Sequence, residues 1–377
     1  MTISYRLSDI YNLQMGKTPS RDNDTYWKDG EYEWISIADL SKCDKYISQT
    51  KEKITKKAVE ESGIHIIPAD TVIMSFKLSI GKVAITQKAL FSNEAIMAFI
   101  DKKVVSISPQ YAFYLFSAQN WDAGTNRAVM GSTLNKATLS QYRVLIHDVQ
   151  TQAEIVERLD KLSDLIRHRR QELQKLDDLV KSQFIEMFGS IRDNRFNFPV
   201  GTIGQECVLK SGTSLPVEVE NEGGDIPYVK VGDMTYKGSE KYILESSHMV
   251  SQMTAESGLF PPGTIIFPKR GGAIGTNKKR ITAIPICADL NIMAVIPGKR
   301  ISAQYLYSYF LAIDLGKLNN GSTVPQINNK DIAPLKILVP PTERQDEFAR
   351  FVEQTDKSKV LCSRSKFLIS LLGGVEK

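Results

Sequence analysis

Lysine and arginine residues gather around an Ile-Gly pair at two places in this sequence. The first pair is Ile80-Gly81 and the second is Ile274-Gly275. The polar residues that flank them are Lys77, Lys82, Lys269, Arg270, Asn277, Lys278, Lys279 and Arg280. Glycine lets a backbone approach a phosphate closely, and Lys or Arg neutralises the phosphate charge. These segments are therefore predicted to bind nucleic acid, and a solvated charged hairpin is the alternative.

A Gly-Ser-Thr tripeptide also occurs twice, at 131–133 and at 321–323. Hydroxyl and amide groups suit contacts with phosphates and base edges, and Gln or Asn can bind adenine through two hydrogen bonds. A turn followed by a helix N-cap is the alternative interpretation. The candidate DNA-binding residues of these segments are Arg127, Ser132, Thr133, Lys136, Ser322, Thr323, Gln326, Asn328 and Lys330.

The sequence does not contain the nucleotide-binding or methyltransferase motifs that would indicate catalysis. Gly16-Lys17-Thr18 resembles the end of a phosphate-binding P-loop, but Tyr11 stands where that motif has its first glycine. The glycines at 271–275 lack the GxGxxG spacing of a dinucleotide site, and a hairpin turn is expected there instead. Neither Pro-Pro pair, at 261–262 and 340–341, belongs to the Asn/Asp-Pro-Pro-aromatic tetrapeptide of adenine methyltransferases. We therefore expect a chain without catalytic residues of its own.

Composition and cysteine spacing exclude several other classes of protein. The 377 residues are 42% hydrophobic and 24% charged, which are ordinary globular values. The four cysteines and four histidines form no local pairs, so the sequence predicts neither a disulfide scaffold nor a metal site. No uncharged apolar run reaches the roughly 18 residues that a membrane span needs. We expect a cytoplasmic protein with no membrane contact, and its net charge of +5 permits nucleic-acid binding.

The chain is an imperfect tandem repeat. Residues 61–100 and 256–296 both begin with Glu-Ser-Gly and continue through an apolar stretch, basic residues, Ile-Gly and a second apolar stretch. The tetrapeptides Ser-Pro-Gln-Tyr at 108–111 and Ser-Ala-Gln-Tyr at 302–305 follow in the same order. Such matches at one nearly constant spacing indicate a duplicated unit, and this period is too long for a solenoid.

A long helix is predicted from residue 152 to residue 188, where proline and glycine are absent. Its apolar residues recur in alternating steps of four and three, which is typical of a coiled-coil seam. A second helix is predicted from residue 342 to about residue 372, and the two helices could pair antiparallel. The apolar seam residues are Ile155, Leu159, Leu162, Ile166, Leu173, Leu176, Val180, Phe348 and Val352.

The expected fold class is therefore α+β. Two mixed α/β domains in tandem, residues 1–150 and 190–341, are separated and followed by long helices, residues 151–189 and 342–377, that form an antiparallel coiled coil. Strands are expected at 71–76, 82–86, 264–268 and 292–296, and short aromatic helices at 109–117 and 303–311.

With these features, the chain resembles the specificity subunit of a type I restriction–modification enzyme. The Ile-Gly segments, the run Gly-Ser-Thr-Val-Pro-Gln-Ile-Asn at 321–328 and the run Val-Pro-Pro-Thr-Glu-Arg-Gln at 339–345 are the matching motifs. The resemblance covers essentially the whole chain. The first half departs from it, because Leu-Asn-Lys stands at 134–136 and His-Asp at 147–148.

The resemblance implies that each globular domain is a target-recognition domain that reads half of an asymmetric, bipartite site on double-stranded DNA. It implies that the helices act as a spacer and as the dock for two methyltransferase subunits. S-adenosylmethionine, ATP and magnesium would be bound by partner subunits, among them a restriction or translocase subunit where one is present, and not by this chain. Two alternatives are a freestanding DNA-binding or decoy protein and a coiled-coil adaptor that binds other proteins.

Overall fold

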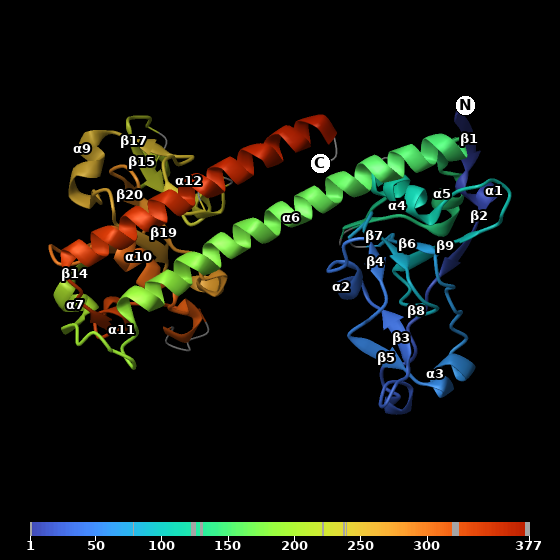
Figure 1. Ribbon diagram of the computed structural model, residues 1–377, viewed down its shortest axis with the longest axis horizontal. Helices are drawn as coiled ribbons and strands as arrows, with labels where there is room; N and C mark the ends of the chain where they lie inside the picture. The colour runs from blue at the N-terminus through green and yellow to red at the C-terminus, as the bar shows by residue number, and fades with distance from the viewer. Residues whose placement is uncertain are drawn as a thin grey trace. The chain divides into compact units, whose positions relative to one another are not determined.

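The computed structural model describes residues 2–77, 79–121, 126–128, 131–220, 222–236, 238, 240–318 and 324–373. The chain forms two compact units (Figure 1). Unit 1 extends to His168 and also includes the end of the chain from Leu368, and unit 2 runs from Arg169 to Phe367. Each unit is described separately below.

Unit 1 is built on a mixed five-stranded sheet of order β2-β9-β6-β7-β4. The edge strand β4 pairs parallel to β7, and the other pairs are antiparallel. The strands of this sheet are β2 (Tyr11–Met15), β4 (Tyr46–Ile47), β6 (Val72–Ser75), β7 (Val83–Thr86) and β9 (Ile96–Asp101).

Smaller sheets and helices complete unit 1. Sheet β5-β3-β8 and the pairs β1-β12 and β10-β11 add the strands β1 (Thr2–Arg6), β3 (Tyr32–Ile35), β5 (Glu52–Ile54), β8 (Phe91–Ser92), β10 (Asn126–Ala128), β11 (Gly131–Thr133) and β12 (Arg143–His147). The helices are α1 (Leu7–Ile10), η1 (Asp24–Tyr26), α2 (Ile37–Leu40), α3 (Lys56–Glu61), α4 (Pro109–Ser117), α5 (Lys136–Gln141) and α6 (Val149–Phe188), which continues into unit 2.

Unit 2 repeats this plan with the sheet order β14-β21-β18-β19-β16. Its strands are β13 (Val200–Thr202), β14 (Cys207–Ser211), β15 (Ile226–Val229), β16 (Tyr242–Ile243), β17 (Met249–Val250), β18 (Ile265–Pro268), β19 (Arg280–Thr282), β20 (Cys287–Ala288), β21 (Ile292–Pro297) and β22 (Lys336–Leu338). Its helices are α7 (Ile203–Glu206), α8 (Val217–Glu220), η3 (Asp233–Thr235), α9 (Gln252–Ala255), η4 (Glu256–Gly258), η5 (Gly271–Thr276), α10 (Ala303–Leu311), η6 (Leu315–Leu318), α11 (Asn329–Ile332) and α12 (Thr342–Gly373).

The duplication predicted from the sequence is confirmed by topology. The five-stranded sheets have the same order, and the edge strands β4 and β16 are both parallel to their neighbours. The predicted strands and both aromatic helices are present within one or two residues of their expected bounds. The glycines at 271–275 differ from expectation, because they form the short helix η5 and not a hairpin turn.

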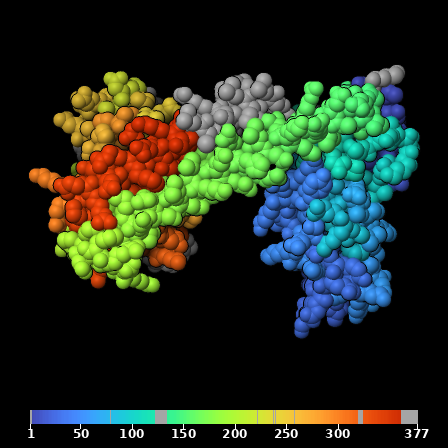
Figure 2. All heavy atoms as spheres, in the orientation of Figure 1, coloured from blue at the N-terminus to red at the C-terminus, as the bar shows by residue number. Residues whose placement is uncertain are grey.

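Helices α6 and α12 pack against each other within unit 2 (Figures 1 and 2). The ring of Phe348 lies 5.4 Å from that of Phe188, and Lys359 Nζ lies 2.6 Å from a carboxylate oxygen of Asp177. Residue numbers that rise on one helix while they fall on the other show that the pair is antiparallel, as the sequence predicts. Helix α6 ends before Gly189, whose φ of 69° is unfavourable for any residue with a side chain.

Candidate nucleic-acid interface

The two predicted DNA-binding segments of unit 2 lie side by side. The N–H of Gly271 donates to the carbonyl of Pro325 at 2.9 Å, and the N–H of Ile327 donates to the carbonyl of Lys269 at 2.9 Å. Arg270 and Gln326 form an isolated antiparallel bridge between these two bonds. Segments that lie more than fifty residues apart in the sequence thus form one surface, on which the Arg270 side chain is exposed.

Unit 1 joins the equivalent segments through the same kind of bond. The N–H of Leu134 donates to the carbonyl of Phe76 at 3.1 Å, which places the chain after β11 beside Lys77. Lys82 and Lys136 are exposed, and Lys136 opens helix α5. Strands β10 and β11, which carry Arg127, Ser132 and Thr133, pair with each other.

Some predicted residues fall outside the described part of the structure. Of Arg127, Ser132 and Thr133 the structure describes the backbone but not the side chains. Ser322 and Thr323 lie wholly outside the described residues. Their proposed contacts with DNA therefore stay predictions.

The loop after 324 follows the helix-cap alternative. Asn328 is the N-cap residue of α11, and its N–H donates to Oδ2 of Asp331 at 2.8 Å. Its Oδ1 accepts from Nε2 of Gln326 at 2.9 Å. In unit 1, Oδ1 of Asn135 accepts from the N–H of Thr138 at 2.8 Å at the start of α5. Lys330 is exposed on α11. The caps fix the ends of these loops and leave the lysines that follow them in solvent.

Two lysines predicted to bind DNA are buried, and the prediction does not fit them. Lys269 is 7% exposed and donates from Nζ to Oγ of Ser211 at 2.6 Å. Lys279 is 2% exposed and donates to Oδ1 of Asn277 at 2.7 Å and to the carbonyl of Ile313 at 2.6 Å. Burial lowers the pKa of both ammonium groups. A phosphate could reach them only if these internal bonds broke.

Arg280 and Asn277 also have internal roles. Arg280 is half-buried and donates to the carbonyls of Met234 and Lys279 at 2.7 and 2.8 Å. Asn277 has a φ of 54° at the end of η5, and its Oδ1 accepts from the N–H of Leu315 at 2.9 Å. Of the predicted residues around Ile274-Gly275, Arg270 and the half-buried Lys278 are the basic side chains without an internal bond among the described residues.

The burial of Lys279 predicts a pH dependence of stability. Its pKa falls to about 8 in the folded chain, against about 10.4 in an unfolded one. Below pH 8 both states hold the proton, so the full cost of burying the ammonium is present. Between pH 8 and 10 the unfolded state binds more protons, so the free energy of unfolding rises with pH.

Chemical denaturation measures this effect as a difference between wild type and Lys279→Met. Between pH 7 and pH 10 the free energy of unfolding of wild type should rise by about 2–3 kcal/mol relative to that of the variant. Contributions that do not depend on pH cancel in this comparison. Lys278→Met, the neighbouring substitution, should show a difference from wild type that is flat over the same range. A flat difference for Lys279→Met would contradict the assignment of this pKa.

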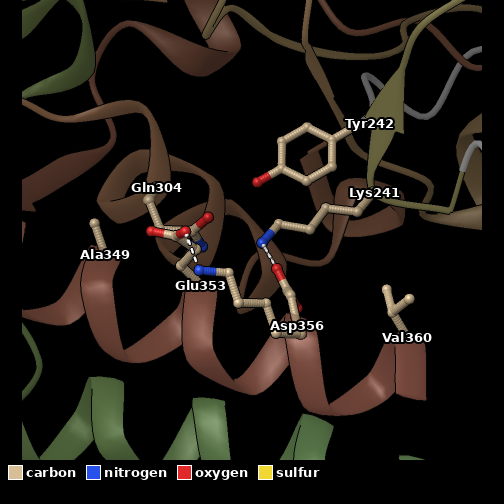
Figure 3. Close-up of a pocket in the computed structure, with 8 residues that line it drawn as sticks. Lys241, Tyr242, Gln304, Ala349, Glu353, Asp356 and Val360 are labelled. Carbon is tan, nitrogen blue, oxygen red and sulfur yellow. Dashed lines mark hydrogen bonds and ion pairs between the residues drawn. The ribbon is translucent and has the colours of Figure 1, made fainter. Parts of the chain in front are cut away.

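A groove of about 640 Å³ lies in unit 2 between β16 and α12 (Figure 3). Tyr242 and Gln304 are among the residues that line it. Its charges neutralise one another, because Lys241 lies 2.5 Å from Asp356 and Lys357 lies 2.7 Å from Glu353. The groove therefore presents no unpaired ionised group that could start acid–base or nucleophilic chemistry. Among the described residues, no group of three His, Cys, Asp or Glu side chains is placed to hold a metal ion.

The ion pair in this groove has a counterpart in unit 1. There Lys45, next to the edge-strand residue Tyr46, bonds to Asp160 of α6. Each unit thus connects its edge strand to its long helix through a lysine and an aspartate.

None of the described helices is long and apolar enough to span a membrane.

The helix residues proposed to dock partners divide into two groups. Val180, Phe348 and Val352 are buried in the core of unit 2, so the chain itself covers them, which does not fit a docking role. Ile155 is half-buried and packs on the core of unit 1. The remaining seam residues, all half-buried, are Leu159, Leu162, Ile166, Leu173 and Leu176.

Comparison with known families agrees with the repeat. Residues 3–177 and 197–364 both match the model of the type I restriction modification DNA specificity domain. The chain belongs to this family. It is a DNA specificity subunit of the type I restriction–modification systems, a non-catalytic kind of subunit.

Named specificity subunits are similar over nearly the full length of the chain. The MjaIX specificity subunit of Methanocaldococcus jannaschii is 26% identical, with 92% of this chain and 85% of the relative covered. The EcoprrI specificity subunit of Escherichia coli is 21% identical, with 93% and 86% covered. The crystal structure of the type I S subunit from M. genitalium has the same fold, with a TM-score of 0.54, 14% identity, and 99% and 94% of the two chains covered.

Proposed function

We propose that each unit of this specificity subunit reads one half of an asymmetric, bipartite site on double-stranded DNA. The observation that carries the proposal is the joined pair of segments in each unit, at Phe76–Leu134 and at Lys269–Ile327. One topology presents different side chains at these places. Because sequence is read through side chains that meet base edges, the two half-sites should differ.

Basic residues that are exposed or half-buried form the DNA-contact surfaces of this proposal. They are Lys77, Lys82 and Lys136 in unit 1, and Arg270, Lys278 and Lys330 in unit 2, with Gln326 and Asn328 beside them. Lys269 and Lys279 are left out of this proposed set, because both side chains are buried and their ammonium groups are bonded internally. Phosphate contacts by the exposed lysines would position the chain, and amide side chains would add base contacts.

Helices α6 and α12 are proposed to set the distance between the half-sites and to dock two methyltransferase subunits. In this proposal the partner subunits bind S-adenosylmethionine and methylate adenine, and a restriction subunit, where one is present, uses ATP and magnesium. The chain itself holds no cofactor and works on DNA in the cytoplasm. The half-buried seam residues between Leu159 and Leu176 are the candidates for docking.

Mapping of methylated adenines in the host genome, with and without this gene, tests the proposal. We expect one asymmetric, gapped motif to lose methylation completely when the gene is deleted. Reintroduction of the gene should restore it. Unchanged methylation would favour a decoy protein or a coiled-coil adaptor, and the adaptor would also show no salt-dependent affinity for duplex DNA.

A further inference from the structure

Glu94 is an exposed carboxylate in the turn between β8 and β9 of unit 1. It lies beside the predicted DNA surface, because the N–H of Phe76 donates to the carbonyl of Ala95 at 3.0 Å and so brings the residue after Phe76, Lys77, next to this turn. The sequence around Glu94 does not mark it as a DNA-binding residue, since its neighbours in the fold come from distant parts of the chain.

Two basic side chains, Lys77 and Arg21, act on this carboxylate. The N–H of Lys17 donates to the carbonyl of Ser92 at 2.8 Å just before the turn. Arg21 is held in place by two bonds to Glu52, at 2.6 and 3.1 Å, and by the face of Trp27, 3.8 Å away. The neighbourhood is therefore suited to a nucleic-acid backbone, but the carboxylate itself would repel phosphate.

Glu94 stays ionised at neutral pH. Partial burial opposes ionisation, but the hydrogen bond from Thr18 Oγ1 and the charges of Lys77 and Arg21 outweigh it and hold the pKa below its ordinary value. An ionised carboxylate only accepts hydrogen bonds. The hydrogen bonds from Thr18 and from the N–H of Glu94 itself use two of its roughly four acceptor sites, so acceptor capacity remains.

The fold does not require a carboxylate at this position. In unit 2 the matching turn is closed by the same bond, from the N–H of Ile292 to Asp289, as from Ile96 to Asn93 in unit 1. By this register Leu290 stands where unit 1 has Glu94. The turn thus forms equally well around an apolar residue, so Glu94 serves something that differs between the two units.

We propose that Glu94 reads a base in the half-site of unit 1, by accepting a hydrogen bond from the exocyclic amino group of cytosine or adenine. Within the major groove, cytosine N4 and adenine N6 are the base donors that a carboxylate can accept from, and guanine and thymine present acceptors in their place. Lys77 and Arg21 offset the repulsion between the carboxylate and nearby phosphates. This inference rests on the proposed function and assigns one base contact within it.

The test uses the full chain, assembled with its methyltransferase subunits, and methylated adenines mapped across a genome. Glu94→Gln keeps the shape of the side chain but adds an amide N–H donor. This donor can bond to the acceptor groups of guanine or thymine, so these bases become acceptable at the position. We expect it to relax the motif at one cytosine or adenine position of one half-site, with a loss of discrimination on the order of ten-fold, and to leave the other half-site unchanged. Glu60→Gln, an exposed substitution on α3, is the matched control and should leave the motif intact.

The outcomes separate this inference from the proposed function. If wild type shows a gapped motif and Glu94→Gln leaves that motif unchanged, the role of Glu94 is overturned and the proposed function stands. An equal loss of affinity of Glu94→Gln for every duplex also overturns it, because a base contact acts on one position. Absence of any gapped motif in wild type contradicts the proposed function itself.

Discussion

Replacement of Gln345 by leucine is expected to destabilise unit 2 by about 3–5 kcal/mol. Gln345 is fully buried at the start of α12. Its Nε2 donates to the carbonyls of Arg300 and Pro340, both at 2.8 Å, and its Oε1 accepts from the N–H of Ser302 at 2.8 Å. Leucine fills a similar volume but leaves three buried backbone groups without a partner, and each costs about 1–3 kcal/mol.

The same device stands at the start of α6 in unit 1. Gln152 is 3% exposed, donates to the carbonyls of Ser106 and His147 at 2.8 and 2.9 Å, and accepts from the N–H of Ser108 at 3.2 Å. Gln152→Leu should therefore destabilise unit 1 as Gln345→Leu destabilises unit 2.

Chemical denaturation of the full chain distinguishes the two variants. All three tryptophans lie in unit 1, at 27, 34 and 121, so their fluorescence reports on unit 1 alone. Gln152→Leu should shift the fluorescence transition, whereas Gln345→Leu should leave it in place and shift only the part of the circular-dichroism transition that fluorescence does not follow. Gln354→Leu, on the exposed face of α12, is the control and should change stability by less than about 0.5 kcal/mol. A similarly small effect of Gln345→Leu would contradict the bonding described here.

Features with a local cause could be predicted from the sequence. The absence of proline and glycine between Gln152 and Phe188, followed by Gly189, indicates helix α6 to within three residues of its start. Ser108 and Ser302 cap the short aromatic helices, whose N-terminal N–H groups need such an acceptor. The repeat needed only the comparison of one half of the sequence with the other.

Features that depend on distant residues could not be predicted. Lys279 looks like any surface lysine in a basic run, and its burial follows from a carbonyl 34 residues away, at Ile313. Lys269 lies where unit 1 has the buried Phe76, since each accepts through its carbonyl from the equivalent loop, at Ile327 and at Leu134. The position is internal in both units, and a lysine there reaches Ser211. A pattern of charges in the sequence shows which residues are basic but does not show how deeply each side chain is buried.

Four residues inserted into α6 should lengthen the gap of the recognised DNA motif, if the helix is the spacer that we propose. The insertion is placed within the segment from Ser163 to Arg167. This segment lies between Asp160, which bonds to Lys45 in unit 1, and Asp177, which pairs with Lys359 in unit 2. Four helical residues add about 6 Å and a rotation of about 40°. One base pair adds about 3.4 Å and about 34°, so a gap one base pair longer matches the rotation and is the expected result.

Genome-wide methylation mapping gives the gap directly. Both half-site sequences should persist while the original spacing loses its methylation, because the insertion leaves the DNA surfaces of both units untouched. The same four residues inserted between Lys103 and Val104, in an exposed turn of unit 1, form the control and should leave the gap unchanged. If the helix insertion kept the original gap, the distance between half-sites would have to be set by the partner subunits, and α6 would serve for docking alone.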